Sequence, residues 1–312
     1  MNNVPSTLPE RIVNNLQSVI RGKPESLKYI VAAFLAGGNV LLEDVPGVGK
    51  TTLAKALALS VRGAFKRVQF TPDLLPTDII GSYIYNPREG TFSFKEGPVF
   101  ANILLADEIN RASPRTQSSL LEAMNENQVT IEGNRFILPA PFMVLATQNP
   151  IEFHGTYPLP EAQLDRFLMK LRLGYPESEQ EMEILEGQRE HHPLENLHPV
   201  VELEEVLEAQ RQVRQVRVEK PVARYLLLLV EETRRESRLR LGVSPRGSLS
   251  LYRAAQALAF LNGREYALPD DIKEIAVCVL AHRLMLETKT RYSGVTPEHI
   301  IEDILAKTKV PT

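Results

Sequence analysis

Two glycines, a lysine and two threonines stand close together in one stretch that could bind phosphate, Asp44-Val45-Pro46-Gly47-Val48-Gly49-Lys50-Thr51-Thr52. An apolar run, 39–42, precedes this stretch and a helical pattern, 53–58, follows it. A strand, a glycine turn, Lys-Thr and a helix, in this order, are typical of a phosphate-binding loop. The glycines let backbone N–H groups curve around phosphate oxygens, and the helix N-terminus adds positive partial charge. We therefore expect Lys50 to reach the β- and γ-phosphates and the Thr51 hydroxyl to bind Mg²⁺.

The loop departs from the strict motif at one position. The strict pattern begins with a glycine six residues before the lysine, and Asp44 stands there instead. Aspartate tolerates turn and left-handed backbone conformations, so it can partly replace that glycine. The alternative interpretation is an ordinary glycine turn between a strand and a helix. A second, acidic motif further along the chain favours the phosphate-binding interpretation.

That acidic motif is the pair Asp107-Glu108, which follows the apolar run 101–106. A buried strand of a parallel sheet delivers such residues to its carboxyl end, where α/β proteins bind ligands. We expect Asp107 to hold Mg²⁺ through water and Glu108 to act as the general base on the attacking water. Alone, an acidic pair after a strand would indicate a helix cap or a solvated loop. Together with the upstream loop, it predicts a nucleotide-hydrolysing site.

Two further positions could complete this site. A second core strand that is expected to be fully buried, 142–147, ends in Gln148-Asn149-Pro150, and a polar residue at the tip of a core strand can order water near a γ-phosphate. A helical segment broken at Gly22 comes just before the first core strand. Such a segment can pack beside a purine base, and an ordinary core helix is an equally good interpretation of it.

Composition and charge limit the function classes. The net charge of −3 provides no overall basic field for nucleic acid, so only a local basic patch could bind it. No apolar run approaches the roughly 20 residues of a membrane span. The first residues lack a basic region followed by an apolar core, so we expect no secretory signal. Cys278 is the only cysteine and can form no internal disulfide, which fits a reducing cytoplasm.

The length of 312 residues suggests two domains, with a boundary at Gly174-Tyr175-Pro176. Residues 1–174 are expected to form an α/β nucleotide-binding core, and residues 175–312 a smaller helical domain. Apolar runs and alternation predict core strands at 39–42, 65–70, 101–106, 142–147 and 167–171, and hairpins at 81–94 and 129–138. The segment 71–80 is rich in proline and aspartate and is expected to be a loop. Helical periods occur at 10–20, 25–35, 52–61, 116–126, 177–188, 203–216, 222–237, 246–261, 270–282 and 297–306.

Together these motifs resemble those of the AAA+ ATPases, and within them the MoxR family, over nearly the whole chain. The most specific stretches are 41–51, 107–112, 146–150, 159–167 and Ser244-Pro245-Arg246. The aspartate at position 44 is usual for this family. The resemblance implies an α/β fold: an AAA+ P-loop core with a parallel five-stranded sheet sandwiched by helices, two β-hairpin inserts, and an all-α helical lid domain. The hairpins are similar to the family's helix-2 insert and pre-sensor hairpin.

The resemblance also implies roles for individual residues. Asn149 is similar to the residue that senses the γ-phosphate, and Arg166 to an arginine finger supplied to the ATP of a neighbouring subunit. Arg246 is similar to a second sensor that contacts the γ-phosphate in its own chain. The implied catalytic residues are Glu108, Lys50, Asn149, Arg166 and Arg246, and the implied metal-holding residues are Thr51 and Asp107. The expected nucleotide contacts are Asp44, Val45, Pro46, Gly47, Val48, Gly49, Lys50, Thr51, Thr52, Gly22, Asp107 and Arg246.

Both arginines have ordinary structural alternatives. Arg166 could form a surface ion pair with its neighbour Asp165, although such pairs contribute little to stability. Arg246 could be an ordinary residue of a first helical turn. The helix dipole disfavours a cation at that position, which favours a binding role.

The implied function is Mg²⁺-dependent hydrolysis of ATP in a homo-oligomeric ring, expected to be a hexamer. Family members act as chaperone-like partners of von Willebrand factor A domain proteins, so we expect such a partner and a client protein for this cytoplasmic chain. One alternative is a DNA-remodelling ATPase, similar to a helicase or a clamp loader, which the charge balance disfavours. Another is a nucleotide-gated scaffold that hydrolyses ATP negligibly, which the complete acidic pair disfavours.

Overall fold

A five-stranded parallel sheet forms the centre of the molecule. The computed structural model describes residues 6–150, 156–188 and 191–311. The strands lie in the order β2-β5-β8-β1-β9, and every neighbouring pair is parallel. They are β1 (Val40–Glu43), β2 (Phe65–Gln69), β5 (Ile103–Asp107), β8 (Met143–Gln148) and β9 (Met169–Leu171). The predicted sheet is therefore confirmed, and all five carboxyl ends meet at one edge.

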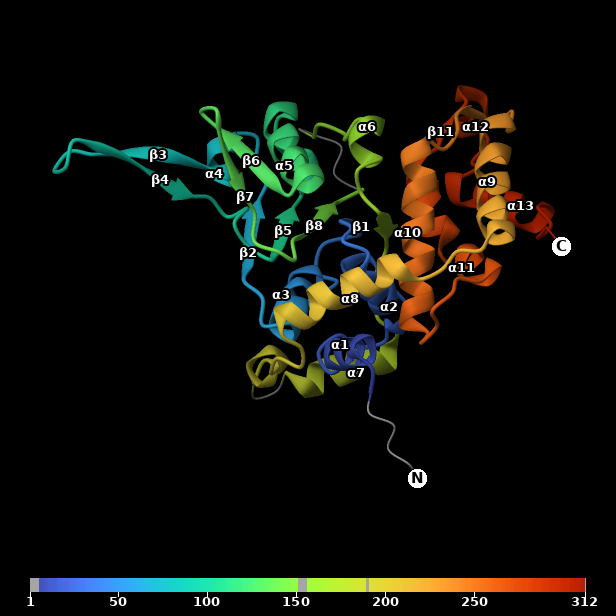
Figure 1. Ribbon diagram of the computed structural model, residues 1–312, viewed down its shortest axis with the longest axis horizontal. Helices are drawn as coiled ribbons and strands as arrows, with labels where there is room; N and C mark the ends of the chain where they lie inside the picture. Colours follow the sequence, from blue (N-terminus) through green and yellow to red (C-terminus); the bar gives the residue numbers. More distant parts are fainter. Residues whose placement is uncertain (1–5, 151–155, 189–190, 312) are drawn as a thin grey trace.

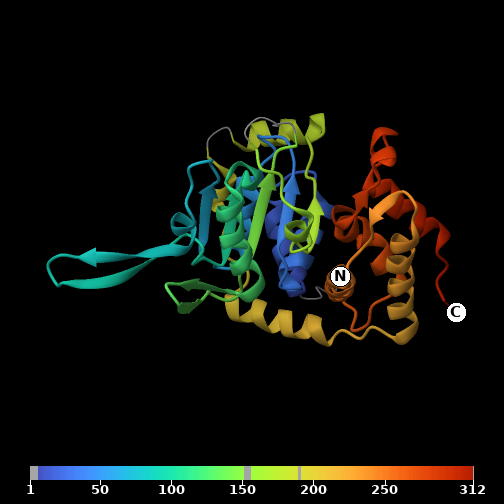
Figure 2. The same cartoon turned by 90° about the horizontal axis from the view of Figure 1, so that it is seen from above.

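Helices cover both faces of this sheet (Figures 1 and 2). Side chains alternate along each strand, so Val40 and Leu42 pack on one face and Leu41 packs on the other. The first face is covered by α1 (Leu8–Gln17), α2 (Pro24–Leu35) and α3 (Lys50–Ser60), and the second by α4 (Pro76–Ile80) and α5 (Pro114–Glu126). The expectation of a loop over 71–80 was wrong at its end. Pro76 starts the short helix α4 and buried Ile79 fixes it against the core.

Two antiparallel hairpins extend from the sheet, as the sequence predicts. They consist of β3 (Gly81–Asn86) with β4 (Thr91–Glu96), and of β6 (Gln128–Ile131) with β7 (Asn134–Ile137). The β3–β4 hairpin projects far from the body of the protein (Figure 1). At its base, the Phe94 ring stacks on Phe136 of the second hairpin with 4.2 Å between ring centroids. The two hairpins are therefore packed against each other and not independent of one another.

The chain after the sheet is helical. Its helices are α7 (Ser178–Gly187), η2 (Pro193–Asn196), α8 (Leu203–Gln215), α9 (Lys220–Arg235), α10 (Pro245–Leu261), α11 (Pro269–Leu280), η3 (Ala281–Arg283), α12 (Thr288–Tyr292) and α13 (Pro297–Lys307). A small sheet of β10 (Leu239–Leu241) and β11 (Met285–Leu286) adds to them. These two strands are too short to produce a recognisable alternation in the sequence, so they were not predicted.

The lid helices α9 to α13 lie beside the β9 edge of the sheet (Figures 1 and 2). Helix α8 runs from the core toward the lid (Figure 2). The Gln210 side chain of α8 donates a 2.8 Å hydrogen bond to the carbonyl of Phe34 at the end of α2. The segment after residue 174 thus contacts both parts of the molecule, and the boundary at that residue stays a prediction.

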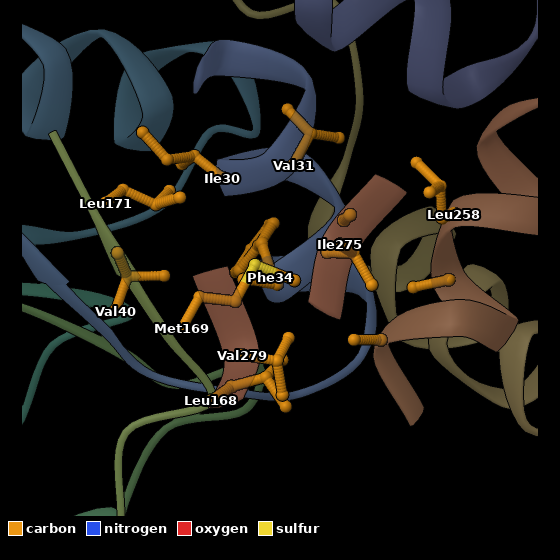
Figure 3. Close-up of a cluster of buried hydrophobic side chains, with 14 of the residues drawn as sticks. Ile30, Val31, Phe34, Val40, Leu168, Met169, Leu171, Leu258, Ile275 and Val279 are labelled. Atoms are coloured by element: carbon orange, nitrogen blue, oxygen red, sulfur yellow. The ribbon is translucent and has the colours of Figure 1, made fainter. Parts of the chain in front are cut away.

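One continuous apolar cluster joins the core to the lid (Figure 3). Phe34 of α2 and Met169 of β9 face Ile275 and Val279 of α11, and all four side chains are buried. Phe34 lies at the centre of the labelled group (Figure 3). Because apolar burial is the main stabilising contribution in folding, this cluster fixes the lid against the sheet.

We expect Phe34→Ala to lower the free energy of unfolding by about 3–5 kcal/mol, the usual cost of a large cavity in a packed core. Phe92→Ala is the matched control, because Phe92 is 68% exposed on the β3–β4 hairpin. Urea denaturation of both variants measures the difference. Equal losses of stability would contradict the central position of Phe34.

A buried histidine also lies at this joint. His282 of η3 is 8% exposed, and the Arg283 guanidinium lies 2.7 Å from its Nε2 atom. Burial and the neighbouring Arg283 charge hold the pKa of His282 well below its ordinary value. The folded protein therefore keeps this imidazole neutral at pH values where the unfolded chain protonates it.

This difference predicts a loss of stability on acidification below about pH 6.5, at up to about 1.4 kcal/mol per pH unit. The sign follows from proton uptake, since the unfolded state binds the proton that the folded state excludes. His282→Gln should flatten the dependence of unfolding free energy on pH between 6.5 and 5. His198→Gln, which changes an exposed histidine, should leave the dependence unchanged. If the unfolding free energy of the His282 variant depends on pH as steeply as that of the wild type, the contribution assigned to His282 is wrong.

Candidate active site

The turn between β1 and α3 has the backbone of a phosphate-binding loop. Gly47 and Gly49 both have φ +88°, in the left-handed region that side chains rarely adopt. A Cβ atom at either position would meet nothing within 4 Å, so the requirement for glycine is conformational and not steric. Gly49 is the N-cap of α3, which therefore begins at Lys50. The first backbone N–H groups of α3 have no partner within the helix and point toward the loop.

Lys50 closes the loop on itself. Its ammonium group donates a 2.8 Å hydrogen bond to the carbonyl oxygen of Asp44, six residues earlier. Burial lowers the pKa of Lys50, against the attraction of the nearby Asp44, Asp107 and Glu108 carboxylates. Lys50 is held partly out of water and can bind an anionic ligand. The nearby carboxylates carry more negative charge than Lys50 can neutralise alone, so a metal ion could bind at the same place.

Asp44 has a different role from the one expected. Its side chain is 6% exposed, and its carboxylate accepts hydrogen bonds from the backbone N–H groups of Leu173 and Gly174. Its backbone does not have a positive φ, so left-handed tolerance was the wrong reason for aspartate here. Instead, the Asp44 carboxylate connects the start of the loop to the residues that follow β9. Its contact with nucleotide stays a prediction.

The acidic pair is held at the carboxyl end of β5 by a residue of the neighbouring strand. The Thr147 hydroxyl of β8 donates to Asp107 Oδ1 at 2.5 Å and accepts from the Glu108 N–H at 2.8 Å. Glu108 has φ +56°, a conformation that costs energy in a non-glycine residue and is characteristic of functional sites. Thr147 was quoted in the sequence motif without a role. The structure gives it one, because it binds the Asp107 carboxylate and the backbone N–H of Glu108.

Two side chains of β2 also face this pair, and sequence reasoning missed both. Arg67 forms an ion pair with Asp107, with 2.7 Å between Nη2 and Oδ2. Gln69 donates a 2.7 Å hydrogen bond to Glu108 Oε2, which also accepts from Arg111 at 2.9 Å. The signal that could have found Gln69 is its place at the end of a predicted strand. Parallel strands bring their carboxyl ends to one edge, and β2 is the neighbour of β5.

One cavity brings most of the predicted site residues together. Of the predicted residues, it is lined by Pro46, Gly47, Gly49, Lys50, Thr51, Thr52, Asp107, Glu108 and Asn149, with Arg67 and Gln69 added by the structure. Val45 and Val48 belong to the loop but do not line this cavity. The cavity contains a lysine, a helix N-terminus, a hydroxyl group and two carboxylates. This combination suits a magnesium–nucleotide complex.

The donor set fits Mg²⁺, which prefers oxygen ligands. The Thr51 hydroxyl and the Asp107 carboxylate would hold it. Within the described residues, no group of three or more His, Cys, Asp or Glu side chains could hold a metal. Phosphate oxygens and water would therefore have to supply most of the ligands, which is usual for Mg²⁺ bound with a nucleotide.

Gly22 lies outside this cavity lining. Its φ of +70° requires glycine, and a Cβ atom there would overlap the Gln180 side chain of α7. The adjacent Lys23 donates a 2.8 Å hydrogen bond to the carbonyl of Tyr175. The segment is therefore packed under the chain that follows β9, and its contact with a purine base stays a prediction.

Arg166 and Arg246 lie together, apart from the residues that line the cavity. Arg166 donates to the Leu121 carbonyl at 3.0 Å, and Arg246 donates to Asn125 Oδ1 at 2.8 Å. Leu121 and Asn125 are four residues apart on α5, which is one helical turn. The structure thus places the two arginines beside each other, and it does not bring Arg246 to the phosphate-binding loop of its own chain.

Comparisons with known proteins agree with this fold. Residues 39–169 match the family described as "ATPase family associated with various cellular activities (AAA)", and residues 231–304 match the AAA lid domain. Chaperone MoxR1 of Mycobacterium tuberculosis is 41% identical over 97% of this chain and 82% of its own. Protein MoxR of Methylorubrum extorquens is 31% identical over 93% of this chain and 92% of its own.

Two other relatives match over nearly full length. The uncharacterized protein YeaC of Bacillus subtilis is 50% identical over 96% of this chain and 94% of its own. A crystal structure from Cytophaga hutchinsonii, described as that of a candidate ATPase, has a TM-score of 0.89 and 40% identity. It covers 96% of this chain and 94% of its own.

Fold, loop and lid together define an AAA+ protein with a P-loop nucleotide site. The near full-length identity to proteins named MoxR narrows this class. The chain belongs to the MoxR family of AAA+ ATPases. No helix among the described residues has the length and apolar character needed to cross a membrane.

The role found for Asp44 leads to a test. Restoring the glycine of the strict motif with Asp44→Gly should destabilise the protein, because the N–H groups of Leu173 and Gly174 lose their acceptor. We expect a loss about 1–3 kcal/mol larger than that of Asp73→Gly, which changes an exposed turn aspartate and measures the backbone cost of glycine. Urea denaturation gives both values. Equal losses would show that the Asp44 carboxylate does not stabilise the loop.

Proposed function

We propose that this protein is a Mg²⁺-dependent ATPase that works as a homo-oligomeric ring and remodels a partner protein. The observation that carries the proposal is the single cavity lined by Lys50, Thr51, Asp107, Glu108 and Asn149. Each of these side chains has a separate task in phosphoryl transfer to water. Their convergence at one sheet edge supports hydrolysis more than binding alone.

In this proposal Lys50 neutralises charge on the β- and γ-phosphates, and Thr51 and Asp107 hold the metal ion. Bound Mg²⁺ supplies further neutralisation of the charge that develops in the transition state. Glu108 takes a proton from the attacking water, and Asn149 orients that water. Glu108 Oε2 accepts from Gln69 and Arg111, so a water that binds at this oxygen would have to displace one of these contacts.

The site of one chain lacks an arginine finger of its own, since Arg166 and Arg246 do not line its cavity. In a ring, both arginines would face the ATP of the neighbouring subunit. Both arginines contact residues one turn apart on α5, which supports their acting together. The proposed action of Arg246 therefore moves from its own chain to the neighbouring subunit. A hexamer is the ring size that we propose from the family resemblance.

The partner is proposed by resemblance as well. MoxR1 of Mycobacterium tuberculosis is named a chaperone, which supports a chaperone-like role here. We propose a von Willebrand factor A domain protein as partner, acting with this chain on a client in the cytoplasm. The exposed Tyr85 and Phe92 on the projecting β3–β4 hairpin provide an apolar surface for such a contact.

Arg166→Ala tests the proposal. We expect ATP affinity to stay within about twofold and turnover to fall roughly a thousandfold, the usual contribution of an arginine finger. Lys50→Ala should instead abolish ATP binding. Arg224→Ala, which removes an exposed arginine of α9, serves as the control and should keep wild-type turnover. ATP binding and steady-state phosphate release are measured on the assembled protein. Normal turnover in Arg166→Ala would remove the finger assignment.

A further inference from the structure

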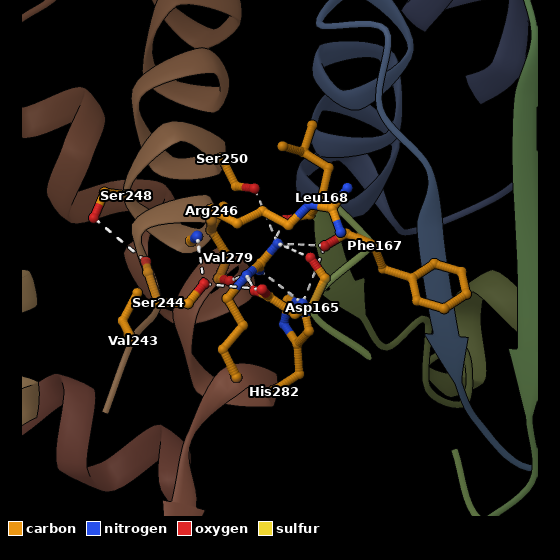
Figure 4. A network of polar contacts seen from close by, with 12 residues as sticks. Asp165, Phe167, Leu168, Val243, Ser244, Arg246, Ser248, Ser250, Val279 and His282 are labelled. Carbon is orange, nitrogen blue, oxygen red and sulfur yellow. Dashed lines mark hydrogen bonds and ion pairs between the residues drawn. The ribbon is translucent and has the colours of Figure 1, made fainter. Parts of the chain in front are cut away.

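The most enclosed charged group at the joint between core and lid is the guanidinium of Arg283, whose side chain is 1% exposed. Arg283 belongs to η3 of the lid, directly after α11. Figure 4 shows the polar network at this joint, in which Ser244 and Ser250 of the lid lie near Asp165, Phe167 and Leu168. Burial lowers the pKa of Arg283 to about 10, which still leaves it charged at neutral pH.

The contacts of Arg283 surround the peptide groups on either side of Arg166. Its Nη2 donates to the Asp165 carbonyl at 3.4 Å and to the Phe167 carbonyl at 2.5 Å. Its Nη1 donates to the Leu168 carbonyl at 3.3 Å, and its Nε donates to Asp165 Oδ1 at 2.9 Å. One lid side chain therefore fixes the backbone from which the proposed finger extends.

The same Asp165 carboxylate also binds the start of the helix that carries the other arginine. Ser244 is the N-cap of α10 and lies two residues before Arg246. Its hydroxyl donates to Asp165 Oδ2 at 2.8 Å and accepts from the Gly247 N–H at 3.1 Å. Asp165 lies next to Arg166 in the chain, and its carboxylate thus connects the start of the helix that carries Arg246 with the buried Arg283. Figure 4 shows Asp165 and Ser244 close together at this joint.

Stability alone does not account for this arrangement. A buried ion pair is weak evidence for stability, because desolvation of both charges offsets most of their attraction. A guanidinium has five N–H donors in one plane, so it can hold several acceptor groups in fixed positions at once. Here the acceptors on the segment that contains Arg166 are one carboxylate and three carbonyl groups, those of Asp165, Phe167 and Leu168. The same guanidinium also donates to the Ser250 hydroxyl and the Val279 carbonyl of the lid.

We propose that Arg283 and Asp165 are positioning residues that hold Arg166 and Arg246 as one unit, so that the lid of one subunit sets hydrolysis in its neighbour. The proposal rests on the ring ATPase proposed above, in which both arginines act across the subunit boundary. Arg283 and Ser244 belong to the lid, and both bind Asp165, which belongs to the core. A movement of the lid therefore also moves the segment that carries Arg166. ATP turnover in the neighbour then depends on the lid position of this chain.

The test uses two variants and a matched control. Arg283→Lys keeps a positive charge but loses the planar set of N–H donors. We expect turnover to fall roughly a hundredfold with ATP affinity unchanged, as for a misplaced catalytic group. Ser244→Ala keeps Arg283 and loses the bond to Asp165, with a smaller loss of about tenfold. Thr296→Ala removes the equivalent N-cap hydroxyl of α13, which has no bond to Asp165, and should keep wild-type turnover.

A mixing experiment separates positioning across subunits from a local structural defect. Each variant is co-expressed with Glu108→Gln chains and mixed oligomers are purified through two tags. The Glu108→Gln chain lacks its base but offers intact arginines, so it should restore turnover in the site of an adjacent Arg283→Lys or Ser244→Ala chain. Arg166→Ala is rescued in the same way if the finger acts in trans.

The outcomes are distinct. Rescue of all three variants supports the positioning role. Rescue of Arg166→Ala without rescue of Arg283→Lys and Ser244→Ala overturns the positioning role but not the proposed function. Wild-type turnover in both lid variants has the same meaning. Failure to rescue Arg166→Ala, or absence of turnover in the wild-type ring, overturns the proposed function itself. If Arg283→Lys does not fold, Ser244→Ala decides alone.

Discussion

The parallel register of the five strands is the constraint on which the site depends. Because β5 lies between β2 and β8, Asp107 is beside Gln69 and one strand away from Thr147. Because β1 lies next to β8, the loop that begins at Asp44 opens toward the same edge. A shift of one residue in any of these strands would turn its side chains to the other face. The apolar alternation that places Leu41 against α5 and Leu42 against α3 therefore also fixes where the carboxylates lie.

This constraint explains what could be predicted from the sequence. The loop, the acidic pair and most helices are local patterns, in which neighbouring residues determine the conformation, and the structure contains them. Strand order is not local. Arg67 and Gln69 reach Asp107 and Glu108 across about 40 residues of chain, through a pairing that no periodicity indicates. The role of Thr147 was hidden for the same reason, although the residue itself belonged to a recognised motif.

For Asp44 and Arg246, the neighbouring residues in the sequence do not indicate the contacts that the structure shows. Asp44 was considered as a backbone substitute for glycine, but its carboxylate is bound by N–H groups 129 and 130 residues away. Arg246 was considered by its place in the first turn of a helix, but its position follows from how the lid docks on β9 and α5. Docking depends on the joint apolar cluster around Phe34, which no single segment specifies.

The ion pairs at the cavity differ from the ion pair at the core–lid joint in how far water reaches them. At the cavity, Arg67 and Arg111 are 47% and 42% exposed, so their pairs with Asp107 and Glu108 are screened by water and easily exchanged for other partners. In the proposed site, a metal ion could therefore displace Arg67 from Asp107, and water could displace Arg111 from Glu108, at little cost. At the joint, Arg283 is enclosed and makes contacts that water cannot replace, so separating it from Asp165 would leave a buried charge unpaired. Exposed, exchangeable contacts thus lie at the proposed nucleotide site, and an enclosed contact lies where the lid is attached to the segment that contains Arg166.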